Sequence, residues 1–334
     1  MQPFTLHRTS RPSEAMTAFE RHPDARFLAG GTTLIDLMKL GIERPGALIH
    51  IDDMPGLDAV TVTSDGTLRI GALARMAGVA DDARVKAGWP MIAESLWKAA
   101  SPQIRNMASI GGNLLQRTRC AYFRDTAFTR CNKRVPGSGC DALEGRHREH
   151  ALLGTSAHCI ATHPSDLCVA LVALDARVEI LSPAGTRSLA FDALHLLPEA
   201  TPHLEHALRP GEMITAVVVP ASAAARRSLY VKVRDRQSYQ FAVTSVAAGL
   251  DLAADGAIRA VRLGLGGVGT KPWRALGAER FLIGRHVDEP TALEAGRLAM
   301  HGAVARPHNA FKLTLMPRTV ADALLQLAGS RVRT

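Results

Sequence analysis

Apolar positions along the first two thirds of the chain recur with the periods of short strands and short helices. The strand-like runs lie at residues 26–29, 47–51, 68–72, 178–181 and 214–219. The helical spacings lie at residues 15–19, 34–40, 79–86 and 91–100. Turn-forming residues separate these runs, with Asp65-Gly66 typical of a hairpin. This part of the chain is therefore predicted to mix helices and strands.

The last third of the chain has a different pattern, with longer alternating runs. The small residues 221–225 are typical of a linker. The strand-like runs that follow lie at residues 228–234, 243–252 and 258–265. Asp255-Gly256 separates the last two runs and is typical of a tight hairpin turn. Helical spacing follows at residues 292–303 and 319–327. This pattern predicts an antiparallel sheet with helices on one face.

Composition places the chain among ordinary folded proteins. Its 334 residues suffice for about two domains, and 47% hydrophobic residues can form normal cores. No apolar run reaches the roughly 20 residues that span a bilayer, and none follows residues 1–8, so we expect neither a membrane segment nor a signal peptide. The formal charge of +9 could suit a nucleic acid, but the basic residues are scattered and only 4% of residues are aromatic. We therefore expect no nucleic-acid partner.

Two glycine pairs occur where a backbone could approach a ligand closely. Residues 30–33 (Gly-Gly-Thr-Thr) follow a strand-like run and precede a helical one, an order that exposes backbone N–H groups at a helix N-terminus and suits a phosphate. Residues 109–113 (Ser-Ile-Gly-Gly-Asn) contain the second pair. Either loop alone is most simply a turn that starts a helix. Two such loops together favour a ligand site.

Four of the five cysteines lie in one segment: Cys120, Cys131, Cys140 and Cys159. Pro-Gly-Ser-Gly at residues 136–139 favours turns, and a loop of about forty residues is uncommon in a domain unless something ties it down. The paired spacing of structural zinc sites is absent, and two disulfides would need an oxidising compartment. A Cys₄ iron–sulfur cluster tolerates irregular spacing, and the surrounding surplus of basic residues would compensate its charge or face an acidic partner. Structural zinc, two disulfides and an iron–sulfur cluster all remain possible ways to order this segment.

The segment 162–166 (Thr-His-Pro-Ser-Asp) precedes an apolar helical run that contains Cys168, which we expect to be buried and inert. Ser165 or Asp166 is expected to cap that helix, although the carboxylate could instead accept hydrogen bonds from ligand hydroxyl groups.

Residues 264–269 match G-x-G-x-x-G, but they follow a hairpin strand and precede Thr-Lys-Pro, which excludes the helix of a dinucleotide fingerprint. We therefore predict no Rossmann site.

Together these segments resemble the FAD-binding subunits of the molybdenum hydroxylase family, which includes xanthine dehydrogenase, aldehyde oxidoreductase and carbon monoxide dehydrogenase. The resemblance covers essentially the whole chain. Residues 28–34 resemble the first FAD loop, 108–113 the second, 164–166 the aspartate turn and 230–232 the lysine strand. The resemblance implies that residues 29–34 hold the FAD pyrophosphate. The FAD contacts that it implies are Ala29, Gly30, Gly31, Thr32, Thr33, Leu34, Ser109, Gly112, Asn113, Asp166, Ile214 and Lys232.

Within this family, the cysteine-bearing insertion resembles that of the FAD subunit of periplasmic aldehyde oxidoreductases, which carries an extra [4Fe–4S] cluster. The similarity lies in residues 120–126, 131–134, 136–140 and 154–156. It implies that Cys120, Cys131, Cys140 and Cys159 are the cluster ligands. Ala121 stands where we would expect proline, which affects no ligand.

The resemblance also implies a fold and a division of the chain. The expected class is α+β, with a two-lobed FAD-binding domain at residues 1–223, similar to that of vanillyl-alcohol oxidase. Its lobes would cover about residues 1–57 and 58–223, with the iron–sulfur insertion at about 117–160. A smaller α+β domain of antiparallel sheet plus helices would follow at residues 224–334.

The implied function is that of an oxidoreductase subunit in a three-subunit enzyme. A large partner would oxidise an aldehyde at a molybdenum cofactor, and a small partner would carry two [2Fe–2S] clusters and any export signal. This chain would pass the electrons through FAD to an external acceptor, without an indispensable acid–base residue of its own. We expect the periplasm by co-export with a signal-bearing partner, or the cytoplasm without one. The alternatives are a stand-alone FAD oxidoreductase of the same fold, and a disulfide- or zinc-stapled binding protein.

Overall fold

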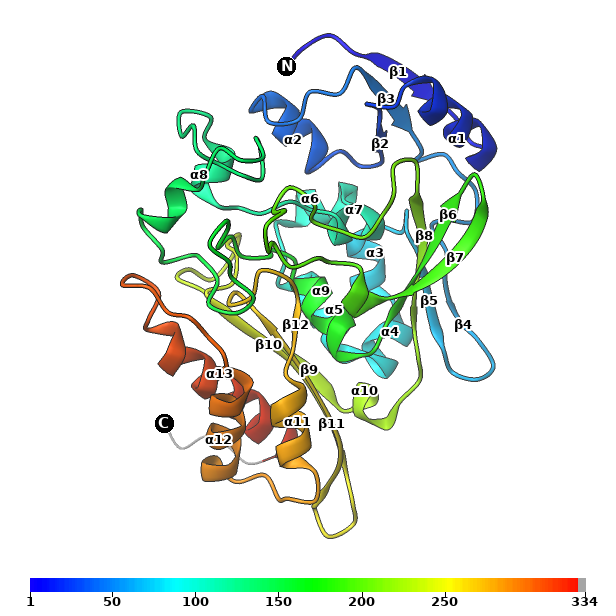
Figure 1. Cartoon of the computed structure of the whole chain (residues 1–334). Coiled ribbons are helices and arrows are strands. Elements are labelled where there is room, and N and C mark those ends of the chain that lie inside the picture. Colours follow the sequence, from blue (N-terminus) through cyan, green and yellow to red (C-terminus); the bar gives the residue numbers. More distant parts are fainter. Residues whose placement is uncertain (330–334) are drawn as a thin grey trace.

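The computed structural model describes residues 1–329, which form three sheets, each with its own helices (Figure 1). The first sheet is parallel, and its strands in pairing order are β1 (Thr5–Arg8), β3 (Ala47–His50) and β2 (Arg26–Leu28). The helix α1 (Pro12–Arg21) buries Ala15 and Met16 in the core of this N-terminal unit. The glycine loop at residues 30–33 joins β2 to α2 (Leu34–Lys39).

The middle unit contains a five-stranded antiparallel sheet. Its strands in pairing order are β4 (Val60–Val62), β5 (Leu68–Gly71), β8 (Met213–Val219), β6 (Arg177–Ser182) and β7 (Gly185–Ala190). The helices of this unit are α3 (Met76–Asp81), α4 (Ala83–Gly88), α5 (Pro90–Trp97), α6 (Pro102–Met107), α7 (Ile110–Leu114) and α9 (Asp166–Ala173). Short 3₁₀ helices lie at Asp141–Leu143 (η1) and Phe191–Ala193 (η2). The predicted helix at residues 79–86 is split, because Asp82 leaves helical geometry and its carboxylate caps α4.

The C-terminal unit confirms the predicted antiparallel sheet with helices on one face. Its strands in pairing order are β12 (Trp273–Arg274), β11 (Ile258–Gly266), β10 (Thr244–Leu252) and β9 (Ser228–Val233). Its helices are α11 (Leu276–Leu282), α12 (Glu289–Ala299) and α13 (Lys312–Ala328), and together they enclose one apolar core. The short helix α10 (Ala223–Arg226) replaces the predicted linker, with Ser222 as its cap.

The cysteine segment, residues 117–160, crosses from the middle unit toward the N-terminal and C-terminal units (Figure 1). Apart from η1, its regular structure is α8 (Ala121–Arg124), so the predicted irregular loop is confirmed. Phe123 packs against Leu37 of α2, while the Leu152 N–H donates to the Val268 carbonyl of the C-terminal unit. Within residues 1–329, no helix combines the length and apolar character needed to cross a membrane.

Candidate functional site

A cavity of about 650 Å³ lies where the middle unit, the α2 loop, the cysteine segment and the C-terminal sheet meet. Its volume is in the range of cofactor-binding pockets. The predicted FAD contacts that line it are Thr32, Thr33, Gly112, Asn113, Asp166 and Lys232. Residues 29–31, Leu34 and Ser109 lie beside these lining positions in the chain. Ile214 is buried in β8, within the core of the middle unit and outside the lining.

The first glycine loop packs against the end of α6, just before the second loop, and residues of both loops line the cavity. A Cβ atom at Gly30 would stand 1.7 Å from the Met107 carbonyl oxygen, so only glycine allows this approach. Gly31 has a φ of +69°, a conformation that side-chain-bearing residues rarely adopt. Thr33 occupies the N-cap position of α2 without a side-chain cap hydrogen bond, which leaves its hydroxyl available at the cavity. The first loop therefore has residues, Thr32 and Thr33, that could contact a ligand in the cavity.

The second loop is tied to the turn at residues 162–166. The Ser109 hydroxyl accepts a hydrogen bond from the Gly112 N–H and caps α7. The Asn113 side-chain oxygen accepts a hydrogen bond of 2.6 Å from the Ser165 hydroxyl, and both side chains are buried. Ser165 in turn caps α9 by accepting from the Cys168 N–H, so Ser165 and not Asp166 makes the predicted cap.

Asp166 instead joins the middle unit to the C-terminal unit. One carboxylate oxygen lies 2.7 Å from Lys232 Nζ, and the other accepts a hydrogen bond of 2.6 Å from the Tyr230 hydroxyl. The Lys232 and Asp166 side chains are 1% and 5% exposed, and Lys232 also donates to the Lys98 carbonyl. Burial and the neighbouring carboxylate raise the pKa of Tyr230 well above its ordinary value. This network fixes Lys232 at the cavity wall.

The four cysteines of the insertion gather at one place, and all are free thiols. Cys131 and Cys140 are joined by an antiparallel backbone bridge. Burial raises the pKa of Cys120 to about 12, and the nearby Cys159 and Cys131 add to this rise. Burial likewise raises the pKa of Cys159 to about 11, with smaller contributions from Cys140 and Cys131. The thiols are therefore close enough to oppose one another's ionisation.

Backbone N–H groups around these thiols favour their ionised form. Those of Phe123 and Tyr122 act on Cys120 and oppose the effect of burial on its pKa. Those of Ala142 and Leu143 act in the same way on Cys140. The Ala161 N–H donates to Cys159 Sγ at 3.4 Å. Thiolates are the form that ligates metals, so this donor set fits a thiolate-bound group such as an iron–sulfur cluster. Cys120 also lines the cavity described above.

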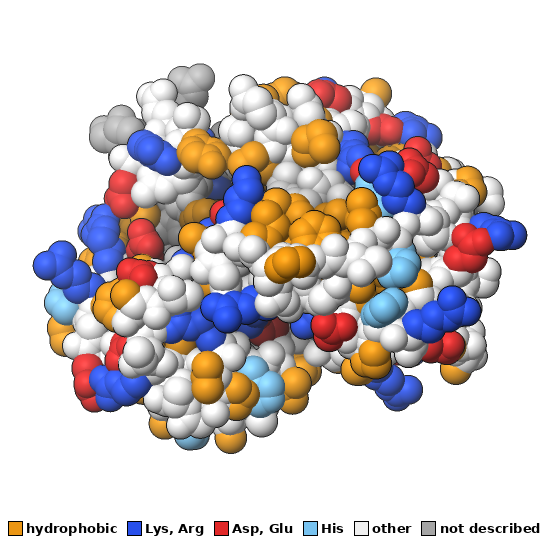
Figure 2. All heavy atoms as spheres, turned by 90° about the horizontal axis from the view of Figure 1, so that it is seen from above, with side chains coloured by type: hydrophobic (Ala, Val, Ile, Leu, Met, Phe, Trp, Pro, Cys, Tyr) orange, Lys and Arg blue, Asp and Glu red, His pale blue; other side chains and the backbone are white. Residues whose placement is uncertain are grey.

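The basic residues of the cysteine segment are mostly paired with acids of the same chain. Arg117 contacts Glu43 and Glu205, and Lys133 contacts the same Glu205. Burial alone would raise the pKa of Glu205, but Lys133 and Arg117 hold it below its ordinary value. Figure 2 likewise shows basic and acidic side chains interspersed over the face that it presents. The predicted surplus of charge is therefore largely neutralised within the protein.

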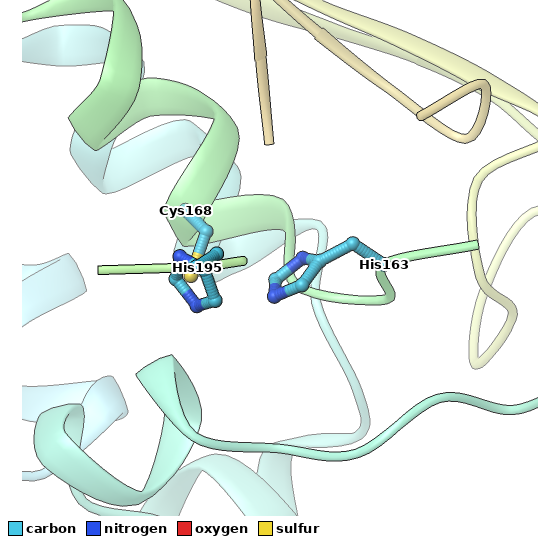
Figure 3. Close-up of side chains that lie close together, drawn as sticks. All are labelled: His163, Cys168 and His195. Atoms are coloured by element: carbon cyan, nitrogen blue, oxygen red, sulfur yellow. The ribbon is translucent and has the colours of Figure 1, made fainter. Parts of the chain in front are cut away.

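A second group of ligand-type side chains, His163, Cys168 and His195, was not predicted (Figure 3). One potential ligand atom from each lies within 4.8 Å of the others. Burial lowers the pKa of His195 to about 4 and raises that of Cys168 to about 12, so both are neutral at pH 7. His206 and Lys271 add to the lowering at His195, while Glu205 and the hydrogen bond to the Leu114 carbonyl oppose it. We interpret the group as neutral packing at the cavity wall, which His163 lines, with Cys168 buried as predicted.

Sequence comparison links the whole chain to known flavoproteins. Residues 2–222 match the family described as "FAD binding domain in molybdopterin dehydrogenase", and residues 229–327 match "CO dehydrogenase flavoprotein C-terminal domain". The chain is 46% identical to the aldehyde oxidoreductase FAD-binding subunit PaoB of Escherichia coli (strain K12), over 98% of each sequence. It is 26% identical to the carbon monoxide dehydrogenase medium chain of Afipia carboxidovorans, over 89% of this chain and 85% of that one.

Solved structures share the fold. A chain of quinoline 2-oxidoreductase from Pseudomonas putida 86 superposes with a TM-score of 0.75 at 23% identity, over 98% of both chains. A chain of the reconstituted CO dehydrogenase from Oligotropha carboxidovorans gives a TM-score of 0.76 at 22% identity, over 99% of this chain and 100% of that one. These comparisons confirm the predicted fold class. The chain belongs to the family of FAD-binding subunits of molybdenum hydroxylases.

Proposed function

We propose that this chain is the FAD-binding, electron-transferring subunit of a molybdenum-dependent aldehyde oxidoreductase. The 46% identity to an aldehyde oxidoreductase FAD-binding subunit over 98% of both sequences supports the reaction class. The single observation that carries the role of this subunit is the cavity, which brings both glycine loops together with Lys232. We propose the same domain division as the sequence suggested, at residues 1–223 and 224–334.

Bound FAD would supply the redox chemistry, while this chain binds and orients it. The close approach of Gly30 to Met107 shapes the loop at residues 29–34, whose N–H and threonine hydroxyl groups would face the pyrophosphate. Gly112 and Asn113 would contact the cofactor from the second loop, which Ser109 holds in place. Lys232, held by Asp166, would place an ammonium group at the cavity wall, and the two residues together form a neutral pair. Ile214, buried in β8 in the core of the middle unit, would pack behind the site without lining the cavity.

We further propose a [4Fe–4S] cluster on Cys120, Cys131, Cys140 and Cys159. The gathering of four thiols, of which Cys131 and Cys159 are buried and the other two half-buried, supports this assignment together with the backbone N–H groups around them. Because Cys120 also lines the proposed FAD cavity, the cluster would adjoin the flavin. This position favours a role in electron relay over one of tying down the loop alone.

The proposed assembly contains two partners and an external electron acceptor. The large partner would hold the molybdenum cofactor, and the small one would hold two [2Fe–2S] clusters. The chain would reach the periplasm with a signal-bearing partner, or remain in the cytoplasm without one. Neither a nucleic acid nor a membrane is part of this proposal.

An anaerobic absorption spectrum of the purified chain, with iron and sulfide assays, tests these proposals. We expect flavin bands above a broad brown shoulder, bleaching on reduction, and about four irons per chain. A yellow protein without iron would keep the flavin role and overturn the cluster. A colourless protein that cannot be reconstituted with FAD would overturn the proposed function.

A further inference from the structure

We infer that His150 donates a hydrogen bond to the sulfur of Cys120 and thereby raises the reduction potential of the iron–sulfur cluster. This inference rests on the proposed [4Fe–4S] cluster and assigns a tuning role to a residue outside its ligand set. His150 Nε2 lies 3.2 Å from Cys120 Sγ. The His150 residue is 4% exposed, and both residues line the proposed FAD cavity.

The surroundings of the ring determine which nitrogen carries the proton. A sulfur that ligates iron is ionised and can only accept a hydrogen bond. Nε2 must therefore carry the hydrogen in a neutral ring, and Nδ1 then carries a lone pair. Nδ1 is buried and has no hydrogen-bond partner among the described residues, which agrees with this tautomer because nothing there competes for the proton.

The backbone of His150 is fixed by the C-terminal unit. Its carbonyl oxygen accepts hydrogen bonds from Lys312 Nζ at 3.2 Å and from the Asn309 side chain at 3.3 Å. Lys312 is 1% exposed, and its ammonium also donates to the Gly267 carbonyl at 2.7 Å. The imidazole is thus attached to a backbone position that two buried side chains hold in place. Movement of the ring away from Cys120 is correspondingly restricted.

The direction of the effect follows from charge. Reduction adds an electron to a cluster whose sulfur ligands already carry negative charge. A hydrogen bond to a ligand sulfur stabilises the more negative, reduced state more than the oxidised state. The buried ammonium of Lys312 behind His150 acts in the same direction. Removal of the His150 donor is therefore expected to make the cluster harder to reduce.

Three variants of the full chain separate this tuning role from a structural one. His150→Leu removes the donor, while His150→Gln keeps an N–H group of similar reach. His147→Leu is the matched control, because His147 is a buried histidine of the same loop that packs edge-on to the His150 ring but whose ring nitrogens contact the Leu143 carbonyl and His308 and no cysteine sulfur. Each protein is assayed for iron, and the cluster midpoint potential is measured by anaerobic titration followed by EPR.

We expect about four irons in every variant. We also expect a lower midpoint potential in His150→Leu, a value between those of His150→Leu and wild type in His150→Gln, and no change in His147→Leu. A fully loaded His150→Leu variant with the wild-type potential would overturn the inference. Absence of iron from the wild-type chain would instead overturn the cluster proposal itself.

A measurement on the wild-type chain covers the case in which His150→Leu fails to load iron. With ¹⁵N-labelled histidine, pulsed EPR of the reduced cluster should detect a weak nitrogen coupling transmitted through the hydrogen bond. No nitrogen coupling would contradict the contact. A strong coupling would identify an imidazole ligand and would also overturn the inference.

Discussion

The cysteine segment and the C-terminal unit are stabilised in different ways. The C-terminal unit buries an apolar core between its sheet and three helices, and its two longest strands, β10 and β11, each have nine residues. The cysteine segment contributes Phe123 and Cys131 to a small apolar cluster with Leu37, and only its end, at Leu152 and Leu153, joins the core of the C-terminal unit. Ion pairs, backbone hydrogen bonds and thiols surround it instead. The part of the segment before residue 151 buries few apolar side chains and requires another source of order, which a metal cluster could supply.

The largest expected effect follows from removal of one thiol from the set. Cys131→Ser should lower bound iron from about four atoms per chain to nearly none and expose the cysteine segment to proteolysis. Cys168→Ala is the matched control, because this buried cysteine lies in α9 outside the set and should leave iron unchanged. Iron assay and limited proteolysis with mass spectrometry give the readout. Wild-type iron content and protection in Cys131→Ser would contradict the assignment.

The same two regions show what could be predicted from the sequence. The period-two runs and the Asp255-Gly256 turn predicted the β10–β11 hairpin, because local alternation and turn chemistry determine it. The start of α13 at Lys312 was missed: the predicted helix covered residues 319–327, whereas the helix begins earlier and runs through Pro317. The irregular character of the cysteine segment was predicted from its turn residues.

Contacts between distant residues could not be predicted in this way. The contact of Asp166 with Lys232 joins positions 66 residues apart, and the grouping of His163 with His195 depends on tertiary packing. No pattern of residue spacing along the sequence predicts either of these contacts. The His150–Cys120 contact likewise joins residues 30 positions apart across an irregular loop. Candidate ligands could thus be predicted by residue type, whereas the groups that orient or tune them required the structure.

A second prediction concerns the cavity that both regions border. Gly30→Ala should abolish stoichiometric FAD binding, because the added Cβ would lie 1.7 Å from the Met107 carbonyl oxygen and displace the first loop. We expect a loss of stability of about 1–3 kcal/mol or more. Gly78→Ala in α3 is the control, since its Cβ meets nothing within 4 Å, and it should stabilise by about 0.5–1 kcal/mol. Flavin content and denaturant unfolding test both variants. Full FAD occupancy in Gly30→Ala would contradict the proposed role of this loop.

A third prediction tests the C-terminal unit through its apolar core. Leu263 is fully buried in β11, so Leu263→Ala should lower the free energy of unfolding by about 2–5 kcal/mol. Bound iron in the folded protein should remain at its wild-type level, because the change lies outside the thiol set. Calorimetry and iron assay of the same sample separate the two effects. Loss of iron from folded Leu263→Ala would show that the two regions are not independently stabilised.

The smallest expected effect concerns a surface ion pair of the cysteine segment. Arg130 is half exposed and contacts Asp141 and Glu144, with Glu144 largely exposed as well. Exposed pairs contribute at most about 1 kcal/mol, and salt screens them, so Arg130→Gln should change stability by less than this. The Arg130 backbone N–H would still donate to Asp141, which keeps the local turn. Thermal unfolding at low and high salt, with an iron assay, provides the test. A loss of iron as complete as that of Cys131→Ser would mean that surface charge, rather than the thiols, determines the order of this segment.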